Sequence, residues 1–255
     1  MKSPESLLEY LVACNDIVVF TGAGVSTGAG IPDYRGPRGI WKTRPEITYQ
    51  DFFEVPEKRE QYWTFKAEDS RQWRDAVPTP VHHAIRKLEE LGKLRAVITQ
   101  NIDGLHRRAG TSPETLIELH GRADQVACVD CGFTDDCAPW YEAWLEEEKK
   151  PFCPECDQFL KPGVVMFGQS LGEEDLARAQ RAMMGPDLVI ALGSTLSVHP
   201  AATFPIMAAR AGIPYLIVNQ GETMHDGMPH VSLRIDDDVQ AVFPPAVEDA
   251  AAMFG

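Results

Sequence analysis

A glycine-rich run from Thr21 to Gly36 carries the residue types that bind a nucleotide. It directly follows Ile17 to Phe20, which is continuously apolar, as expected of a buried parallel strand. Glycines at this place let the backbone turn sharply toward a phosphate, and a following helix would present its positive end. Thr27 stands where the ordinary dinucleotide pattern has its third glycine, and the acidic ribose ligand of that pattern is displaced or missing. A plain turn would also explain the glycines, but it does not require the continuation Ile31 to Arg35.

Four of the six cysteines form two Cys-x-x-Cys pairs, Cys128 with Cys131 and Cys153 with Cys156. This spacing resembles a zinc ribbon, in which four thiolates hold the metal in a closed tetrahedron at about 2.3 Å. Such a site has no open position for substrate, so we expect a structural Zn²⁺. A redox dithiol would account for one pair but poorly for two. The other two cysteines are expected to be reduced thiols.

Polar residues follow several apolar segments, at the point where each segment ends. The runs that begin in this way are Gln100 to His106, His120-Gly121, Gly193 to Thr195 and Asn219-Gln220. The carboxyl ends of parallel strands meet at one edge of a sheet, so these side chains should share a cleft. His120 lies between a strand and a glycine at that edge, which makes it a candidate catalyst. The other histidines considered are expected to be structural, and they are His82, His83, His199, His225 and His230.

The scaffold for these residues is predicted to alternate strands with helices. Strands are expected at Ile17–Phe20, Arg95–Thr99, Leu116–Leu119, Leu188–Leu192, Tyr215–Val218 and Val231–Ile235. Helices are expected at Val81–Leu91, Asp175–Met184 and Ala201–Ala211. This alternation predicts an α/β fold, with a parallel sheet covered by helices on both faces.

Two insertions interrupt the alternation. The first, from 41 to 78, is rich in aromatic residues, which we expect to form the core of a helical module rather than a ligand site. The second, from 126 to 159, carries the cysteine pairs and a short helix predicted at Trp140–Glu148. Together they predict a small domain beside the sheet, with a ligand cleft between the two.

The chain has 255 residues, a formal net charge of -14 and a sequence pI near 4.9. This charge argues against nonspecific binding to nucleic acid or to acidic membranes. The N-terminal segment has no basic stretch, and charged residues interrupt the apolar residues after it, so neither a secretory signal nor a membrane span is expected. Together with the cysteine usage, this predicts a reducing, cytoplasmic location.

These motifs together resemble the sirtuins, the NAD-dependent protein lysine deacylases. The resemblance rests on the glycine-rich run, Gln100 to His106, His120-Gly121, the cysteine pairs, Lys161 to Gly168, Gly193 to Leu196 and Val218-Asn219, in family order across about residues 15–243. It implies one catalytic region over 1–255. Its large Rossmann-like domain would comprise 1–40, 79–125 and 160–255, and its small zinc-binding domain 41–78 and 126–159.

The resemblance also implies roles for particular residues. NAD would be bound by Gly22, Ala23, Gly24, Ser26, Thr27, Tyr34, Arg35, Gln100, Asn101, Ile102, Asp103, Gly193, Ser194, Thr195, Asn219 and Gln220. An acyl-lysine peptide would pair, as an added strand, with Val164, Val165, Met166, Phe167 and Gly168. His120, Asn101 and Asp103 would be catalytic. Cys128, Cys131, Cys153 and Cys156 would hold Zn²⁺.

The implied reaction begins with attack of the acyl-lysine amide oxygen on C1′ of the nicotinamide ribose. An imidate follows, and His120 as general base helps a ribose hydroxyl to attack it. The products would be nicotinamide, free lysine and O-acyl-ADP-ribose. Two alternatives remain: ADP-ribosyl transfer or NAD hydrolysis in the same cleft, and a noncatalytic binding module, which the set Asn101, Asp103 and His120 disfavours.

One departure from the family pattern bears on the substrate. Tyr62-Trp63-Thr64-Phe65 stands in a segment where members that prefer acidic acyl groups carry Tyr-x-x-Arg. Phe65 replaces that arginine, so neutral acyl groups are expected to be preferred over succinyl. An extra glycine in the Thr27 to Gly30 segment and Gln169, in place of a usual acidic residue, leave the chemistry intact.

Overall fold

A six-stranded parallel sheet forms the centre of the larger part of the molecule. The computed structural model describes residues 4–33, 39, 44–147 and 149–254. The strands run in the order β3-β2-β1-β7-β8-β9, the Rossmann arrangement in which the order reverses beside β1. Their bounds are β1 Ile17–Thr21, β2 Leu94–Thr99, β3 Leu116–Glu118, β7 Leu188–Leu192, β8 Tyr215–Val218 and β9 Leu233–Ile235. The six predicted strands and the parallel sheet are confirmed.

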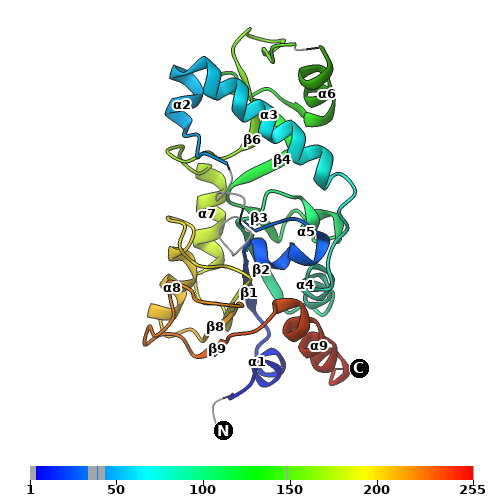
Figure 1. The fold of residues 1–255 in the computed structure, drawn as a ribbon. Helices are drawn as coiled ribbons and strands as arrows, with labels where there is room; N and C mark the ends of the chain where they lie inside the picture. The colour runs from blue at the N-terminus through cyan, green and yellow to red at the C-terminus, as the bar shows by residue number, and fades with distance from the viewer. Residues whose placement is uncertain (1–3, 34–38, 40–43, 148, 255) are drawn as a thin grey trace.

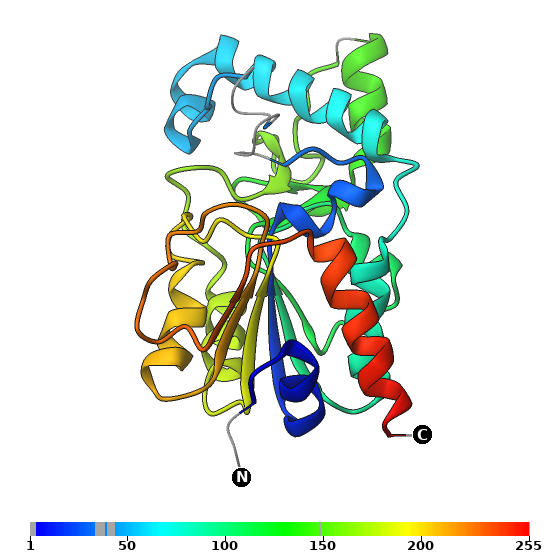
Figure 2. The same cartoon turned by 60° about the horizontal axis from the view of Figure 1, so that its bottom comes forward.

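Helices cover both faces of this sheet (Figure 2). One face packs against α1 (Leu7–Ala13), α4 (Pro80–Glu90) and α9 (Val239–Ala252), and the other against α7 (Glu173–Ala182) and α8 (Thr203–Arg210). Neighbouring residues of β1 point to opposite faces, so Ile17 and Val19 contact the first helix layer while Val18 and Phe20 contact the second. Burial on both faces explains why the strand is apolar throughout.

The patterns in the sequence did not identify α1 and α9. Helix α9 contains Pro244 and Pro245, which remove backbone donors and normally argue against a helix interior. It nevertheless buries Val239, Phe243 and Val247, one turn apart each, against the sheet face. Burial of this stripe outweighs the loss of backbone hydrogen bonds.

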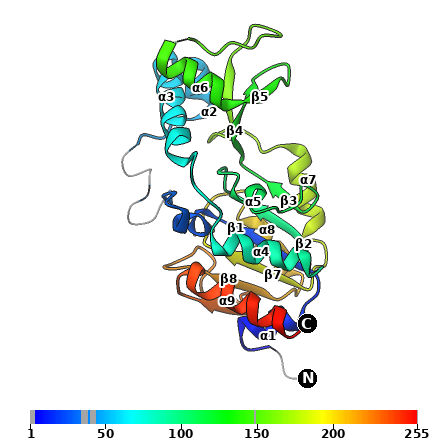
Figure 3. The same cartoon turned by 90° about the vertical axis from the view of Figure 1, so that its right-hand side faces the viewer.

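A second, antiparallel sheet forms the smaller part of the molecule, in the order β5-β4-β6. Its elements are β4 Gly121–Cys128, β5 Thr134–Asp136, β6 Leu160–Val164, α2 Tyr49–Glu54, α3 Pro56–Trp73 and α6 Cys137–Glu147. Figures 1 and 3 show these elements beyond the carboxyl ends of the parallel strands, at the end of the molecule opposite to α1 and α9. The two insertions therefore lie side by side.

A shared core joins the two insertions. The side chain of Trp63 in α3 is 1% exposed, and its Nε1 donates to the carbonyl oxygen of Leu160 at 3.2 Å. Its ring also meets that of Tyr141 in α6 edge to face, with centroids 5.5 Å apart. The expected core role of the aromatic residues is confirmed for Phe52 and Trp63, which are buried here.

The described helices include none with the length and apolar character needed to cross a bilayer.

Candidate active site

A cleft of about 700 Å³ lies where the carboxyl ends of the parallel strands face the small sheet and α3. This volume is typical of a pocket for a small molecule or cofactor. Many of the predicted site residues line it: Gly22, Ala23, Gly24, Thr27, Gln100, Asn101, Ile102, His120, Val164, Val165, Met166, Phe167, Gly168, Gly193, Ser194, Thr195, Asn219 and Gln220. Tyr34 and Arg35 lie outside the described residues.

The glycine-rich turn differs from the expectation in one respect. Within the described residues 22–33 the chain does not continue into an α-helix and instead makes two short 3-10 turns, Ala23–Val25 and Thr27–Ala29. Gly30, at φ +80°, ends the second turn in the left-handed region, where helix growth stops. Residues 22–33 therefore offer no positive end of an α-helix.

Close backbone packing gives the first glycines a different role. A Cβ at Gly22 would lie 2.7 Å from the carbonyl oxygen of Gly193, and a Cβ at Gly24 would lie 2.7 Å from the Cα of Gly193. The amide of Gly24 donates to the same carbonyl at 2.8 Å. The turn after β1 thus lies directly on the end of β7, which closes this wall of the cleft.

A chain of hydrogen bonds holds the side chain of Asn101. Its Nδ2 donates to the carbonyl oxygen of Gly22 at 3.0 Å and to Ser26 Oγ at 3.2 Å. Ser26 in turn donates to Asp103 Oδ2 at 2.7 Å. Burial raises the pKa of Asp103, although bonds from the Leu105 amide and from Ser26 act in the opposite direction. Ser26 and Asp103 lie behind Asn101 rather than among the residues that line the cleft.

A deeper polar layer fixes the backbone of Asn101, and sequence reasoning did not find it. The amide of Asn101 donates to Thr99 Oγ1 at 3.0 Å, and Thr21 donates to the same oxygen at 2.8 Å. Thr21 Oγ1 also lies 3.0 Å from Nε2 of His106. Burial lowers the pKa of His106 to about 3, so the ring is neutral. The only signal in the sequence was that His106 follows the same strand as Asn101.

His120 is oriented as a proton acceptor. Its Nδ1 lies 3.0 Å from the carbonyl oxygen of Gln100, and because a carbonyl only accepts, Nδ1 carries the proton. Nε2 is then the basic nitrogen. Burial lowers the pKa of His120, while the bond to Gln100 raises it. The ring is therefore neutral at neutral pH and lies in the cleft wall.

The segment after β6 is held in shape by bonds to its neighbours. The amide of Tyr49 donates to the carbonyl oxygen of Phe167 at 2.8 Å. Lys161, which is 5% exposed, directs Nζ to the carbonyl oxygens of Pro162, at 2.9 Å, and Val164. Burial lowers the pKa of this lysine to about 7. Tyr49 thus fixes the segment at Phe167, and Lys161 fixes the end of β6 from which the segment leaves.

Helix α3 forms a wall of the cleft, although the sequence interpretation expected its aromatic residues to be core and singled out only Phe65 for a role toward the acyl group. Tyr62, Phe65, Lys66 and Asp69 recur at the spacing of one helix face, and all four line the cleft. Arg44 lies 4.8 Å above the ring of Phe65 and pairs with Asp69 at 2.6 Å. The signal for this wall was the helical period of the aromatic segment.

The loops after β7, β8 and β9 form one end of the cleft, called the far end below. It contains further residues that sequence reasoning missed. Gly221 and Asp238 line it, and so does His199, which was expected to be structural. Ser194 Oγ accepts a bond from Gln100 Nε2 at 2.9 Å, which ties the ends of β2 and β7 together.

The four paired cysteines converge away from the cleft. Their sulfur atoms all lie within 4.8 Å of one another, and the separations Cys128–Cys156 and Cys131–Cys153 are 3.4 and 3.6 Å. A tetrahedron with Zn–S bonds of about 2.3 Å has sulfur–sulfur edges of about 3.8 Å. All four are free thiols. The donor set therefore fits Zn²⁺, as predicted.

The Sir2 family model matches residues 22–200. NAD-dependent protein deacetylase 1 of Bradyrhizobium diazoefficiens is 39% identical over 232 residues, 91% of each chain. NAD-dependent protein deacetylase of Thermotoga maritima is 39% identical over 237 residues, 92% of this chain and 94% of the relative.

Solved structures give the same result. A Sir2 complex with p53 peptide and NAD⁺ is 35% identical, with a TM-score of 0.84 over 96% of this chain and 97% of that chain. A Sir2 variant with deacetylated p53 peptide and 3′-O-acetyl ADP-ribose is 36% identical, with a TM-score of 0.85 over 95% and 96%.

Proposed function

Since the chain belongs to the Sir2 family, we propose that it is an NAD-dependent protein lysine deacetylase. The observation that carries the proposal is the neutral ring of His120, whose Nδ1–H is bound to Gln100 and whose Nε2 is left basic. It lies in one cleft with Asn101 and with the 164–168 segment. A base, a nucleotide pocket and a peptide segment thus share one cavity.

NAD would occupy the cleft along the ends of β1, β2, β7 and β8. Gly22, Ala23, Gly24 and Thr27 would face the diphosphate, while Gly193, Ser194, Thr195, Asn219 and Gln220 would face the adenosine half. Gln100, Asn101 and Ile102 would contact the nicotinamide riboside. The bond chain from Asn101 through Ser26 to Asp103 supports a positioning role for the last two residues.

The peptide would add a strand beside Val164 to Gly168, next to the edge strand β6. The acyl-lysine side chain would then enter the cleft toward α3, where Tyr62 and Phe65 lie. Backbone pairing supplies affinity with little sequence preference, so the site would accept many acyl-lysine proteins.

The reaction uses the activated glycosidic bond of NAD. The amide oxygen of the acyl-lysine bonds to C1′ while the C1′–N bond breaks, and nicotinamide leaves with that electron pair. His120 Nε2 then takes the proton of a ribose hydroxyl, whose oxygen attacks the acyl carbon. The bond from the acyl carbon to the lysine nitrogen then breaks and the protonated amine leaves, water adds to the acyl carbon, and the bond from that carbon to the C1′ oxygen breaks, so the acyl group stays on the ribose hydroxyl of ADP-ribose. A positioned base of this kind contributes about 10² to 10⁴ in rate.

Zn²⁺ held by the four cysteines would stabilise the small sheet and take no part in the reaction. Its binding would couple to folding of the segment that carries both Cys-x-x-Cys pairs. We also propose a reducing, cytoplasmic setting, which is supported by two Cys-x-x-Cys pairs that converge as a metal site.

Product analysis tests the proposal. An acetyl-lysine peptide incubated with NAD should yield nicotinamide, free lysine and O-acetyl-ADP-ribose in equal amounts by mass spectrometry. Transfer of ADP-ribose to protein, or ADP-ribose released without peptide, would favour the transferase or hydrolase alternative instead. If the protein binds ADP-ribose but shows none of these activities, the result would favour a noncatalytic binding module.

A further inference from the structure

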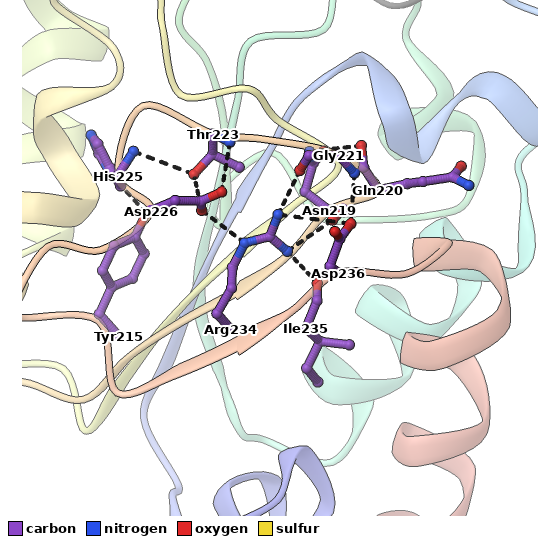
Figure 4. A network of polar contacts seen from close by, with 10 residues as sticks. All are labelled: Tyr215, Asn219, Gln220, Gly221, Thr223, His225, Asp226, Arg234, Ile235 and Asp236. Atoms are coloured by element: carbon purple, nitrogen blue, oxygen red, sulfur yellow. Dashed lines mark hydrogen bonds and ion pairs between the residues drawn. The ribbon is translucent and has the colours of Figure 1, made fainter.

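The loop after β8 lines the far end of the cleft, and Arg234 of β9 binds it at several points (Figure 4). Arg234 Nη1 donates to the carbonyl oxygen of Asn219 at 2.8 Å, and Nη2 donates to that of Gly221 at 2.5 Å. The amide of Gly221 donates to Asp236 Oδ1 at 2.7 Å. Both carbonyls come from residues that line the cleft, while the arginine itself does not line it.

The same guanidinium also holds the second half of the loop. Its Nε donates to Asp226 Oδ1 at 2.8 Å, and this carboxylate accepts bonds from Thr223 Oγ1, at 2.6 Å, and from the Thr223 amide, at 3.0 Å. Burial raises the pKa of Asp226, but the bonds from Arg234 and Thr223 outweigh it and lower the pKa. The carboxylate therefore stays ionised and paired.

A neighbouring bond connects this loop to the other wall of the cleft. The amide of Met224 donates to the carbonyl oxygen of Thr195 at 3.0 Å. Tyr215 OH lies 3.0 Å from Nδ1 of His225, which anchors the loop against β8. One network therefore reaches both segments, 193–195 and 219–221, at this end of the cleft.

We propose that Arg234, with Asp226, is a positioning residue that preforms the adenosine end of the NAD site, an inference that rests on the proposed function. A planar guanidinium with five donors matches several fixed acceptors at once, whereas an ammonium does not. Without it, the Asn219 carbonyl loses the bond from Arg234, the Gly221 carbonyl keeps only the bond from Asn219 Nδ2 at 3.1 Å, and the loop must be ordered by the ligand. That ordering cost lowers affinity for the adenosine half while the chemistry at His120 is unchanged.

The test compares the variant Arg234→Gln with the same substitution at a second arginine outside the cleft, Arg178. Arg178 also gathers three backbone carbonyls, those of Pro113, Glu114 and Leu116 at 2.8–3.1 Å, but it does not line the cleft. Arg178→Gln controls for the loss of a half-buried guanidinium that binds backbone carbonyls. The measurements are ADP-ribose binding by calorimetry, thermal unfolding, and kcat and KM for each substrate.

Arg234→Gln should raise the Kd for ADP-ribose and the KM for NAD about tenfold, equal to about 1.4 kcal/mol. The peptide KM, and kcat at saturating NAD, should stay within about twofold of wild type. Arg178→Gln should lower the melting temperature while leaving the Kd for ADP-ribose unchanged.

Wild-type affinity for ADP-ribose in folded Arg234→Gln would overturn the inference, and so would an equal loss in Arg178→Gln. If Arg234→Gln does not fold, Arg234→Lys decides the matter, because it keeps the charge but not the planar fork. Its Kd should rise severalfold, and an unchanged Kd would refute the positioning role. A wild-type protein that binds no ADP-ribose would instead refute the proposed NAD function.

Discussion

The amide of Val165 donates to the carbonyl oxygen of His120 at 2.8 Å. Since the ring of His120 is also bound to Gln100, the proposed base is tied to the end of β2 and to the proposed peptide segment at once. The base and the segment that would carry its substrate are therefore in fixed register before any ligand enters.

Replacing His120 tests its role as base. His120→Ala should reduce net deacetylation by about 10² to 10⁴ while NAD affinity stays near wild type, because the loss falls on a step after binding. Exchange of labelled nicotinamide should survive better, since attack on C1′ precedes the proton transfer. His83→Ala, at an exposed position of α4, is the control. A folded His120→Ala enzyme with near wild-type turnover would exclude the assignment.

The pH profile follows from the burial of His120. A base works in its neutral form, and burial lowers the pKa of this histidine below its ordinary value, about 6.5. Activity should therefore hold down to a pH below about 6.5 and fall as the ring gains a proton. An acid limb of kcat with a midpoint above that value would contradict this reading.

The zinc assignment predicts unequal effects of two cysteine substitutions. Cys153→Ser should lose Zn²⁺ and destabilise the small sheet, because metal binding of this kind contributes on the order of 10 kcal/mol to folding. Cys137, a buried thiol whose pKa burial raises to about 11, is the control. Cys137→Ser should keep its metal. Elemental analysis showing full zinc in Cys153→Ser would argue against the site.

The residues of α3 that line the cleft should determine which acyl group the enzyme prefers. Arg44 is engaged by Asp69, burial lowers the pKa of Lys66, and Phe65 is apolar, so a buried carboxylate would find a poor partner here. Acetyl-lysine should have a higher kcat/KM than succinyl-lysine. Phe65→Arg should narrow that ratio, with acetyl turnover as the internal reference. A wild-type preference for succinyl would overturn this.

Lys161 should affect peptide binding without affecting NAD. Lys161→Met removes the donors to the Pro162 and Val164 carbonyls, so the peptide KM should rise severalfold. Lys93→Met is the matched control, because Lys93 is also buried and donates to the carbonyls of Leu11 and Cys14 at 2.9 and 2.8 Å. It should lower the melting temperature and leave the peptide KM unchanged. Equal peptide KM values in the two variants would count against a role for Lys161.

Much of the fold could be predicted because its signals are local. Continuous apolar runs such as Leu188–Leu192 predict buried parallel strands, and four thiols at fixed spacing need no further context. Helix α9 was missed because Pro244 and Pro245 break the local pattern, and only packing against the sheet explains it.

The site was predicted less completely, because some roles depend on how far a side chain lies from the cleft surface. Sequence alone does not tell that Ser26 and Asp103 lie behind Asn101, or that the turn after β1 makes 3-10 turns instead of a helix. Arg234 had no motif, since most of its hydrogen bonds go to backbone carbonyls, which any sequence supplies, and its pairing with Asp226 depends on the fold.

The two sheets are connected through a very short link between β3 and β4. Strand β3 ends at Glu118 and β4 begins at Gly121, and the amide of Leu119 is bound to Thr99 of the large sheet at 3.0 Å. His120 thus has its ring held by one sheet and its carbonyl by the segment after the other. Any rotation of one sheet relative to the other must therefore change the conformation of His120. The basicity and orientation of its Nε2 would then depend on the angle between the two halves of the enzyme.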